Sequence, residues 1–353
     1  MGQRYDRHVL SSAQRQRASD AIRRLCESRI DSATLREELV PHLRRLTPFD
    51  GACIVTTDPG FTSSGTGFTY HNVPKSGNTP RVIAAELAGQ DFNHFDVLGR
   101  SLWPVGILSE ATRGDLVRSA RYRELLIPQA ATDELRAACV VDGDRWGSIT
   151  LIRRGGRFDD QDAAAVARIT GLVGRGMRRS LLPRHQELET LDQPAGLLLV
   201  GVDDNIQSVT PAGRYWLDAI SDGSALPGIV QQALVRARLK PGSTPRLRTR
   251  ARNGQWITVH GALLEEPGGP NGTVAIMLER ARPNEITALL LRAYGLSEAE
   301  RRVAELVVEG RSTKQMARAL HLSPYTVQDH LKSVFEKAGV RSRRELVARI
   351  AHS

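Results

Sequence analysis

The segment 322–339, LSPYTVQDHLKSVFEKAG, places its apolar residues at the spacing of an amphipathic helix. At about 100° per residue, one stripe collects Val327, Leu331, Val334, Phe335 and Ala338. Ser323 is a favourable N-cap, and Pro324 suits the first helical position because its missing N–H needs no partner there. The opposite arc carries side chains that donate or accept hydrogen bonds: Tyr325, Gln328, Asp329, Lys332 and Glu336. Such an arc is either a solvated face or a surface that enters a DNA major groove.

Two shorter helical patterns precede this segment, and each begins with a capping box. Ser297 with Glu300, and Ser312 with Gln315, have the S-x-x-E/Q spacing in which two N-terminal amides are satisfied reciprocally. Gly310 is placed to end the first of these helices in the left-handed conformation. The sequence therefore predicts helices that begin near 297 and 312.

The second of these helices is separated from the third by a very short turn. It runs from Ser312 to about Leu320, and only His321 and Leu322 stand before Ser323. Its apolar side consists of Met316, Ala317 and Leu320. This spacing predicts a helix-turn-helix.

A fourth helix is predicted after Gly339, with Ser342 and Glu345 as a third capping box. Its apolar stripe is Leu346, Val347 and Ile350. The four predicted helix caps of the whole region are Ser297, Ser312, Ser323 and Ser342. Four helices in so short a segment predict a compact all-α unit.

Residues 296–350 resemble the DNA-binding domain of LuxR-type transcriptional regulators. The resemblance is carried by Leu296, Ser297, Glu300, Val303, Gly310, Ala317, Leu320, Ser323, Thr326, Val327, His330, Lys337, Ser342 and Arg343. It implies an all-α, four-helix helix-turn-helix domain over 296–353 whose third helix lies in the major groove. By the same resemblance the base-reading positions are Gln328, Asp329, Lys332 and Tyr325, and the phosphate positions are Lys314, Arg318, Thr326 and His330.

The chemistry of the reading arc fits base recognition. Lys332 can donate to guanine O6 and N7, and Gln328 can pair with adenine N6 and N7. Asp329 can accept from cytosine N4 while it repels a misplaced phosphate. Each good contact would contribute about 1–3 kcal/mol of discrimination. The alternative for Asp329 is a solvent-facing side chain that never meets DNA.

Charge and size indicate the partners. The formal charge is +10 for the chain, and residues 296–353 carry 11 Lys and Arg against 7 Asp and Glu. A modest positive field attracts a polyanion and makes its binding salt-sensitive, so we expect double-stranded DNA as a partner. Small domains of this kind usually bind as dimers on half-sites one helical turn apart. We therefore expect a homodimer that acts on the transcription machinery.

The N-terminal part mixes helical and strand patterns. Residues 1–48 predict two helices, the second opened by Asp31 or Ser32 and bent near Pro41. Residues 49–181 predict short strands at 51–58 and after a Gly/Ser turn, then a hairpin over 136–154 that turns at 142–144, and a closing amphipathic helix.

In this order of elements, and in the run WGSITLIRR followed by Phe158, residues 49–181 resemble a GAF sensor domain. The resemblance implies an α/β sensor whose pocket is walled by the segment 93–128 and takes a small-molecule effector. Phe95 and Trp103 either line this pocket or belong to the core, so we assign no ligand contact.

The polar stretch 182–195 contains two prolines and predicts a linker. Residues 196–281 then predict a strand, a turn at Asp204 and Asn205, a helix capped by Thr210, a hairpin through Asn253 and Gly254, and a last strand. This order resembles a PAS-like α/β domain.

A linker helix is predicted over 282–295. Its apolar residues are Ile286, Leu289, Leu290 and Leu291. Such a helix either transmits a change of angle to the DNA-binding domain or pairs with its copy.

Four arginines follow one another on the first arm of the predicted hairpin. Arg246, Arg248, Arg250 and Arg252 alternate with Leu247, Thr249 and Ala251. They either bind an acidic partner or nucleic acid, or mark the solvated face of a sheet. The solvated face is the interpretation we favour, because it requires no partner at all.

Other features limit the class of protein. No apolar run approaches the roughly 18 residues of a membrane span, and the first residues lack the apolar stretch of a secretory signal, so we expect a cytoplasmic protein without a membrane partner. Cys26, Cys53 and Cys139 are scattered, which predicts buried reduced thiols and neither disulfides nor a metal site. A flavin photosensor would need a cysteine, and residues 189–285 contain none. Haem would need an axial ligand, and the one histidine in this stretch, His260, lies in a predicted strand, where a histidine is usually structural. We therefore expect no cofactor.

The sequence as a whole predicts an α+β multidomain transcriptional regulator whose GAF-like and PAS-like region sets the geometry of the reading helices. One alternative is a phosphorylation-controlled response regulator. The VDD of 202–204 offers its acidic pair, but the later strand RLRTRAR lacks the phosphorylatable aspartate. The other is a DNA-tethered enzyme, for which the sequence has no G-x-S-x-G, H-E-x-x-H or P-loop motif. We therefore expect no enzymatic activity.

Overall fold

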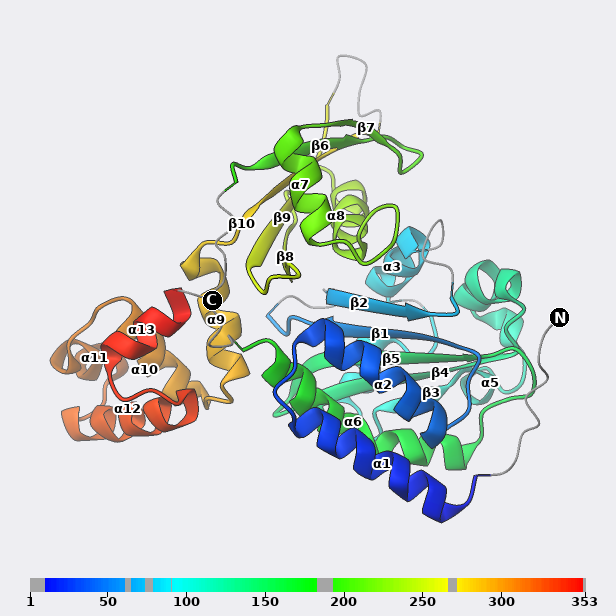
Figure 1. The fold of residues 1–353 in the computed structure, drawn as a ribbon, viewed down its shortest axis with the longest axis horizontal. Helices are drawn as coiled ribbons and strands as arrows, with labels where there is room; N and C mark the ends of the chain where they lie inside the picture. Colours follow the sequence, from blue (N-terminus) through cyan, green and yellow to red (C-terminus); the bar gives the residue numbers. More distant parts are fainter. Residues whose placement is uncertain are drawn as a thin grey trace.

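The computed structural model describes residues 10–60, 65–73, 79–89, 91–182, 193–265 and 272–351. These residues form two five-stranded antiparallel sheets with their helices, followed by a helical unit at the C-terminal end (Figure 1). The predicted α+β class is confirmed at this level. The more specific GAF-like and PAS-like assignments stay predictions.

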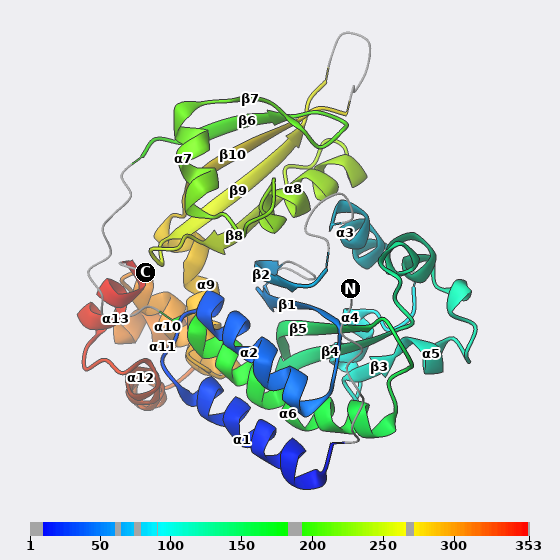
Figure 2. The same ribbon diagram turned by 45° about the vertical axis from the view of Figure 1, so that its right-hand side comes forward.

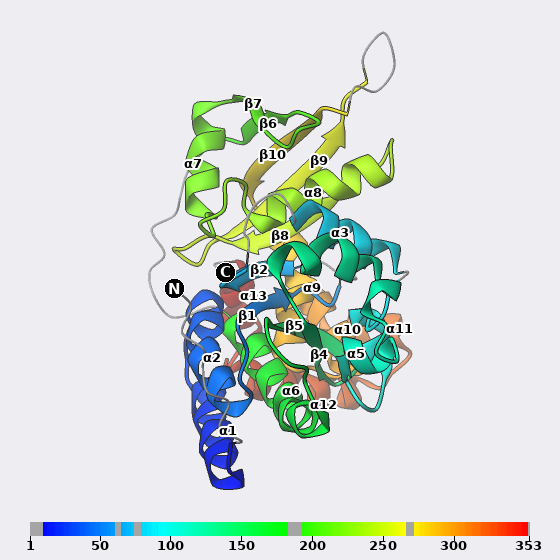
Figure 3. The same cartoon turned by 90° about the vertical axis from the view of Figure 1, so that its right-hand side faces the viewer.

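The first sheet has the order β2-β1-β5-β4-β3. Its strands are β1 (Gly51–Thr57), β2 (Gly65–His71), β3 (Val105–Ile107), β4 (Asp133–Val141) and β5 (Asp144–Arg153). Three helices cover one face, as Figures 1 and 3 show: α1 (Ser12–Glu27), α2 (Ser32–Leu46) and α6 (Asp160–Ser180). Ile54 and Leu151 are fully buried on that face, whereas Cys53 and Val55 point to the other face because side chains alternate along a strand.

The predicted elements of the first unit are largely confirmed. Asp31 is the N-cap of α2, where its side chain accepts from the N–H of Thr34. The hairpin turns at Asp142 and Gly143, which both have positive φ, as a two-residue turn of this type requires. Short helices α3 (Thr79–Ala88), α4 (Phe95–Arg100) and α5 (Leu108–Ala111), with helical turns over 116–129, form the irregular middle.

The second sheet has the order β7-β6-β10-β9-β8. Its strands are β6 (Gly196–Val200), β7 (Ile206–Val209), β8 (Arg246–Arg250), β9 (Trp256–Leu263) and β10 (Val274–Arg280). Helix α7 (Pro211–Ala219) is capped by Thr210, as predicted, and Gly254 has positive φ in the predicted turn between β8 and β9. The pair Asp203 and Asp204 lies in the β6–β7 turn, where Asp204 binds Arg238 at 2.6 Å.

Helix α8 (Gly228–Leu239) was not predicted. Nine of its 12 residues are buried between the two sheets, so no polar face marks it in the sequence. Gln232 on α8 reaches the first unit: it accepts from the N–H of Gly65 at 3.1 Å and donates to the carbonyl of the same residue at 3.3 Å. This helix therefore packs against both units.

The favoured interpretation of the arginine strand as a solvated face was wrong for its middle part. Arg248 is only 7% exposed and forms an ion pair with Asp58 of the first unit, Nη2 to Oδ2, at 2.6 Å. Strand β8 lies beside β2 in Figure 2, where Thr249 donates to the carbonyl of Thr66 at 2.7 Å. The middle of the strand face is therefore covered by the other unit, a long-range contact that alternation along one strand does not reveal, whereas Arg246 and Arg252 at its two ends are exposed.

The predicted linker helix is α9 (Pro283–Ala293). Its apolar residues Ile286, Leu289, Leu290 and Leu291 are all at most 1% exposed, in a helix that packs on α10 (Glu298–Val308) and α13 (Arg343–Ala351). Pairing with a copy through these residues is therefore wrong for this arrangement, because the same chain already covers them. Most of the predicted linker 182–195 lies outside the described residues.

Candidate nucleic-acid interface and internal cavity

The C-terminal unit consists of α10 (Glu298–Val308), α11 (Thr313–Leu320), α12 (Pro324–Ala338) and α13 (Arg343–Ala351). Both predicted capping boxes of α10 and α11 are present, and Ser323 accepts from the N–H of Thr326 at 3.0 Å. At α13, Ser342 accepts from the N–H of Glu345 at 3.1 Å, but the Glu345 carboxylate binds the N–H of Arg341 instead of Ser342. Of the two hydrogen bonds predicted for the third capping box, only the one accepted by Ser342 is therefore present.

Apolar side chains fix α12 in the unit. Val327, Leu331, Val334 and Ala338 are buried, together with Val303 and Val307 of α10 and Met316 and Ala317 of α11. In α13, Leu346 and Ile350 are buried as predicted, whereas Val347 is 36% exposed, so its assignment to the stripe was wrong. Phe335 is partly buried against the same core.

The turn between α11 and α12 has a defined geometry. His321 ends α11 in the left-handed conformation, with φ 55° and ψ 42°. The N–H of Leu322 then donates to the carbonyl of Ala317 at 2.9 Å. This closing bond satisfies a carbonyl at the end of α11 and sets the direction in which α12 leaves the turn.

A polar cluster ties α12 to α10. Glu300 of α10 accepts from Lys337 at 2.7 Å and from Ser333 at 2.6 Å, as well as from the N–H of Ser297 at 2.6 Å. Burial alone would raise the pKa of Glu300, but these hydrogen bonds outweigh it and lower the pKa to about 2. The sequence predicted the role of Glu300 in the helix cap but not its bonds to Ser333 and Lys337, because these residues are distant from it in the sequence.

The predicted base-reading residues lie together on the exposed face of α12. Tyr325 is 81% exposed, and Gln328, Asp329 and Lys332 are also exposed. Gln328 makes a long hydrogen bond of 3.4 Å to the hydroxyl of Thr313 at the start of α11. The arrangement leaves these polar groups open to solvent, on a helix held from its opposite side.

The predicted phosphate residues divide into two groups. Lys314 and Arg318 are exposed on α11, whereas Thr326 and His330 are partly buried. The hydroxyl of Thr326 lies 2.9 Å from the hydroxyl of Ser323, so it already takes part in the helix cap. Arg343 of α13 donates to Thr313 at 2.8 Å and to the carbonyl of Arg311 at 3.1 Å, which fastens the start of α11.

The comparisons with known proteins identify this unit. Residues 295–350 match the family of bacterial regulatory proteins, luxR family. The chain is 36% identical over 55 residues to the spore germination protein GerE of Bacillus subtilis, covering 16% of this chain and 74% of that protein. The chain therefore belongs to the LuxR family of bacterial transcriptional regulators, whose members bind DNA.

A further relative also matches only a small part of the chain. A Mycobacterium bovis protein named as an HTH-type transcriptional regulator is 46% identical over 70 residues, covering 20% of this chain. The chain spans only 7% of the length of that relative. A crystal structure of Escherichia coli SdiA covers 96% of both chains at 10% identity, but its TM-score of 0.36 is too low to establish a shared fold.

A cavity of about 160 Å³ lies in the first unit, on the face of the sheet opposite α1, α2 and α6. Apolar and small side chains line it, among them Val55, Phe95, Leu126 and Ser148. Phe95 thus lies in the lining, whereas Trp103 is 50% exposed and lies outside it. Cys53 is also in the lining, and burial raises its pKa to about 12.

The charged side chains of this cavity are paired. Arg121 binds Glu134 at 2.7 Å, and Arg136 binds Glu86 at 2.6 Å. Burial would raise the pKa of Glu86, but Arg136 and His94 outweigh it and lower the pKa. The pairing leaves these charges satisfied without a ligand. The cavity therefore combines apolar side chains with charged groups that already have partners within the chain.

The residues that the structure describes contain no helix long and apolar enough to cross a membrane. They also contain no group of three or more His, Cys, Asp or Glu side chains placed to hold a metal ion. Within the same residues Cys26 and Cys139 are buried, as predicted, whereas Cys53 is only partly buried.

Proposed function

We propose that this LuxR-family regulator reads DNA sequence with Gln328, Asp329, Lys332 and Tyr325 of α12. The observation that carries the proposal is that these side chains share one exposed face while Val327, Leu331 and Val334 hold the opposite face in the core. A helix whose apolar face is buried in the domain can present its polar face to DNA, and an α-helix has the diameter that fits the major groove. Lys314 and Arg318 of α11 contact phosphate and set the register.

Two chains act together on a two-fold site in this proposal. Small helix-turn-helix domains usually bind as dimers to half-sites about one helical turn apart. The distance between the two α12 helices of a dimer therefore determines its affinity for DNA. Helix α9 joins the N-terminal units to the reader within each chain. The N-terminal side of α9 is fastened to the second sheet by Arg246 and Glu285 at 3.1 Å, and its C-terminal side to the first unit by Arg292 and Asp144 at 2.9 Å. A rearrangement of either unit therefore moves α9.

The signal is a small apolar effector in the cavity lined by Phe95, Leu126 and Ser148. Such an effector controls DNA binding only if it binds the competent and incompetent arrangements with different affinity. An apolar cavity of about 160 Å³ is close in size to an engineered cavity that binds benzene. Benzene is therefore a suitable probe of the site.

The experiment measures stoichiometry and effector response on the full chain. Sedimentation with a duplex that carries a selected two-fold site should give two chains per duplex, and one chain per duplex would contradict the dimer. Benzene should raise the melting temperature of the native chain and not that of Ser148→Leu, which fills the cavity. An equal rise in both chains would show that the cavity is not the binding site.

A further inference from the structure

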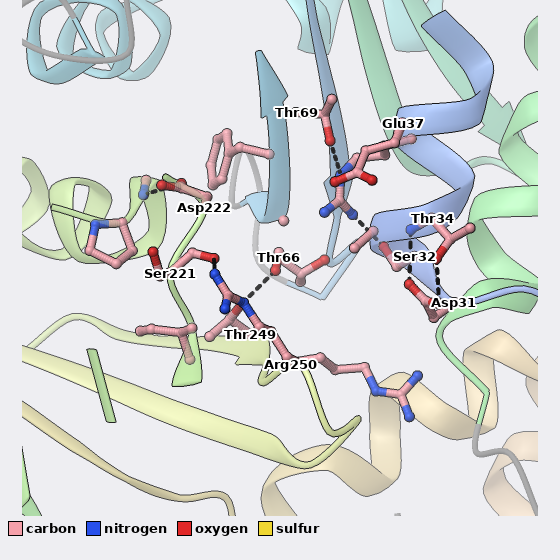
Figure 4. A pocket seen from close by; sticks show the side chains of 18 of the residues that line it. Asp31, Ser32, Thr34, Glu37, Thr66, Thr69, Ser221, Asp222, Thr249 and Arg250 are labelled. Atoms are coloured by element: carbon pink, nitrogen blue, oxygen red, sulfur yellow. Dashed lines mark hydrogen bonds between the residues drawn. The ribbon is translucent and has the colours of Figure 1, made fainter. Parts of the chain in front are cut away.

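A second and larger hollow lies between the two αβ units, and the proposed function does not use it. Its volume is about 970 Å³. One wall comes from α2 and β2 of the first unit, and the other from residues 219–229 and 249–254 of the second. Figure 4 shows Ser32, Glu37 and Thr69 on the first wall facing Ser221 and Asp222 on the other. We name this hollow the inter-unit cleft.

Arg36 of α2 lies in the wall of the inter-unit cleft and is only 6% exposed. Its guanidinium donates to three hydroxyls: Ser32 at 2.5 Å, Thr56 at 3.0 Å and Thr69 at 3.3 Å. Gly67 of β2 leaves room for it, since a Cβ atom at this position would lie 2.6 Å from Nη1 of Arg36. These three hydroxyls and the space at Gly67 therefore accommodate the buried guanidinium of Arg36.

The charge of Arg36 has no close counterpart in the chain. Among the residues that the structure describes, no carboxylate oxygen lies within 4.0 Å of its guanidinium. Burial lowers the pKa of Arg36 to about 10, and the more distant Asp31, Glu37 and Asp222 offset this only in part. A buried charge is costly unless it is paired, so an anion in the cleft would relieve this cost.

The acidic side chains nearby are occupied or exposed. Asp31 caps α2 by accepting from the N–H of Thr34 at 2.9 Å, and Asp222 accepts from the N–H of Gly228 at 2.8 Å. Glu37 is exposed to solvent. These three are the carboxylates that line the cleft, against four arginines: Arg36, Arg44, Arg250 and Arg252.

The other three arginines of the cleft also make contacts within the chain. Arg44 lies 2.6 Å from Nε2 of His71 and stacks over the ring of Phe49 at 5.1 Å. Arg250 donates to the carbonyls of Gly254 and Ser180 at 2.8 and 3.2 Å. Arg252 is exposed at the edge and makes one long bond of 3.4 Å to the carbonyl of Ser221.

We propose that the inter-unit cleft binds a small anion with a phosphate or carboxylate group, whose charge is held by Arg36 at the buried end and by Arg252 at the open edge. Guanidinium groups recognise both anions with charge-assisted, often bidentate hydrogen bonds. Because one arginine belongs to each αβ unit, the bound anion fixes the separation of the two units. The site is separate from the apolar cavity and would take a second signal.

The experiment follows the melting temperature of the full chain as inorganic phosphate or, in a second series, succinate replaces chloride at constant ionic strength. Wild type, Arg36→Gln, Arg252→Gln and Arg175→Gln are compared. Arg175 is an exposed arginine of α6 outside the cleft, so its variant controls for the loss of one positive charge.

The proposal predicts a saturable rise with at least one anion in the wild type and in Arg175→Gln. The half-saturating concentration should increase at least about tenfold in Arg36→Gln and Arg252→Gln, since each variant loses a charge-assisted hydrogen bond to the anion. Saturation by phosphate alone assigns a phosphate ligand, and saturation by succinate alone a carboxylate ligand. A rise that does not saturate, or that is equal in all four chains, overturns the proposal. If Arg36→Gln does not fold, the result for Arg252→Gln tests the proposal by itself. Arg252 is exposed, so its replacement leaves the core intact.

Discussion

The Nη2 atom of Arg248, on the edge strand of the second sheet, lies 2.6 Å from Oδ2 of Asp58, directly after β1 of the first sheet. Both side chains are at most 7% exposed. Arg248 also donates to the backbone carbonyl of Glu285 in α9. One side chain therefore connects both αβ units to the helix that leads to the DNA-binding unit.

Breaking this pair should destabilise the chain strongly. Asp58→Asn leaves the Arg248 charge buried without its carboxylate, which typically costs about 3–5 kcal/mol. The free energy of unfolding in urea measures the loss. Arg246→Gln on the same strand is the control, because Arg246 is 56% exposed and its pair with Glu285 should contribute at most about 1 kcal/mol. Similar losses for both variants would contradict the assigned role of Asp58.

Glu300→Gln should loosen the attachment of α12 to α10. The loss of its charge-assisted bonds to Lys337 and Ser333 should cost about 1–3 kcal/mol at pH 7. Because the pKa of folded Glu300 is lowered to about 2, its stabilisation is fully present above the unfolded value of 4.5 and is lost as the pH falls toward 2.

Urea unfolding of wild type and Glu300→Gln at pH 7 and at pH 2.5 measures this effect. The difference between the two chains should shrink at the lower pH. A difference that stays constant with pH would show that the carboxylate charge plays no part. Glu298→Gln serves as the control, since its exposed pair with Arg301 should give a smaller loss at both pH values.

His321→Gly should stabilise the chain without changing the DNA sequence that it selects. His321 holds a positive φ of 55° at the end of α11, and glycine adopts this conformation without strain from a Cβ atom. We expect a gain of about 0.5–1 kcal/mol in the free energy of unfolding. A loss of stability would mean that the histidine side chain itself stabilises the turn.

The helix-turn-helix could be predicted from the sequence because its signals are local. Ser297, Ser312 and Ser323 each bind an N–H three residues later, and the apolar stripes of α10 to α12 repeat at helical spacing. Glycine with positive φ marks the turn at Gly254 in the same local way.

The relations between units could not be predicted in this way. Asp58 and Arg248 are far apart in the sequence, and alternation along β8 does not reveal that the first unit covers Arg248 and Thr249. Helix α8 is buried on most sides and so lacks a polar face that would mark it. The burial of Arg36 has no local signal in the sequence, because the space and the hydroxyls around its guanidinium come partly from Thr56 and Thr69 and from Gly67 of β2.

The central claim is that the exposed face of α12 reads DNA sequence. The most direct measurement is selection of DNA from a random pool by the full chain, by Lys332→Ala and by Asp329→Ala. We expect an enriched two-fold motif that loses information at particular positions in each variant, with about 1–3 kcal/mol lost for the contact made by Lys332. Enrichment of no motif, with binding that only weakens as salt rises, would mean that α12 contacts phosphate alone and would contradict the account.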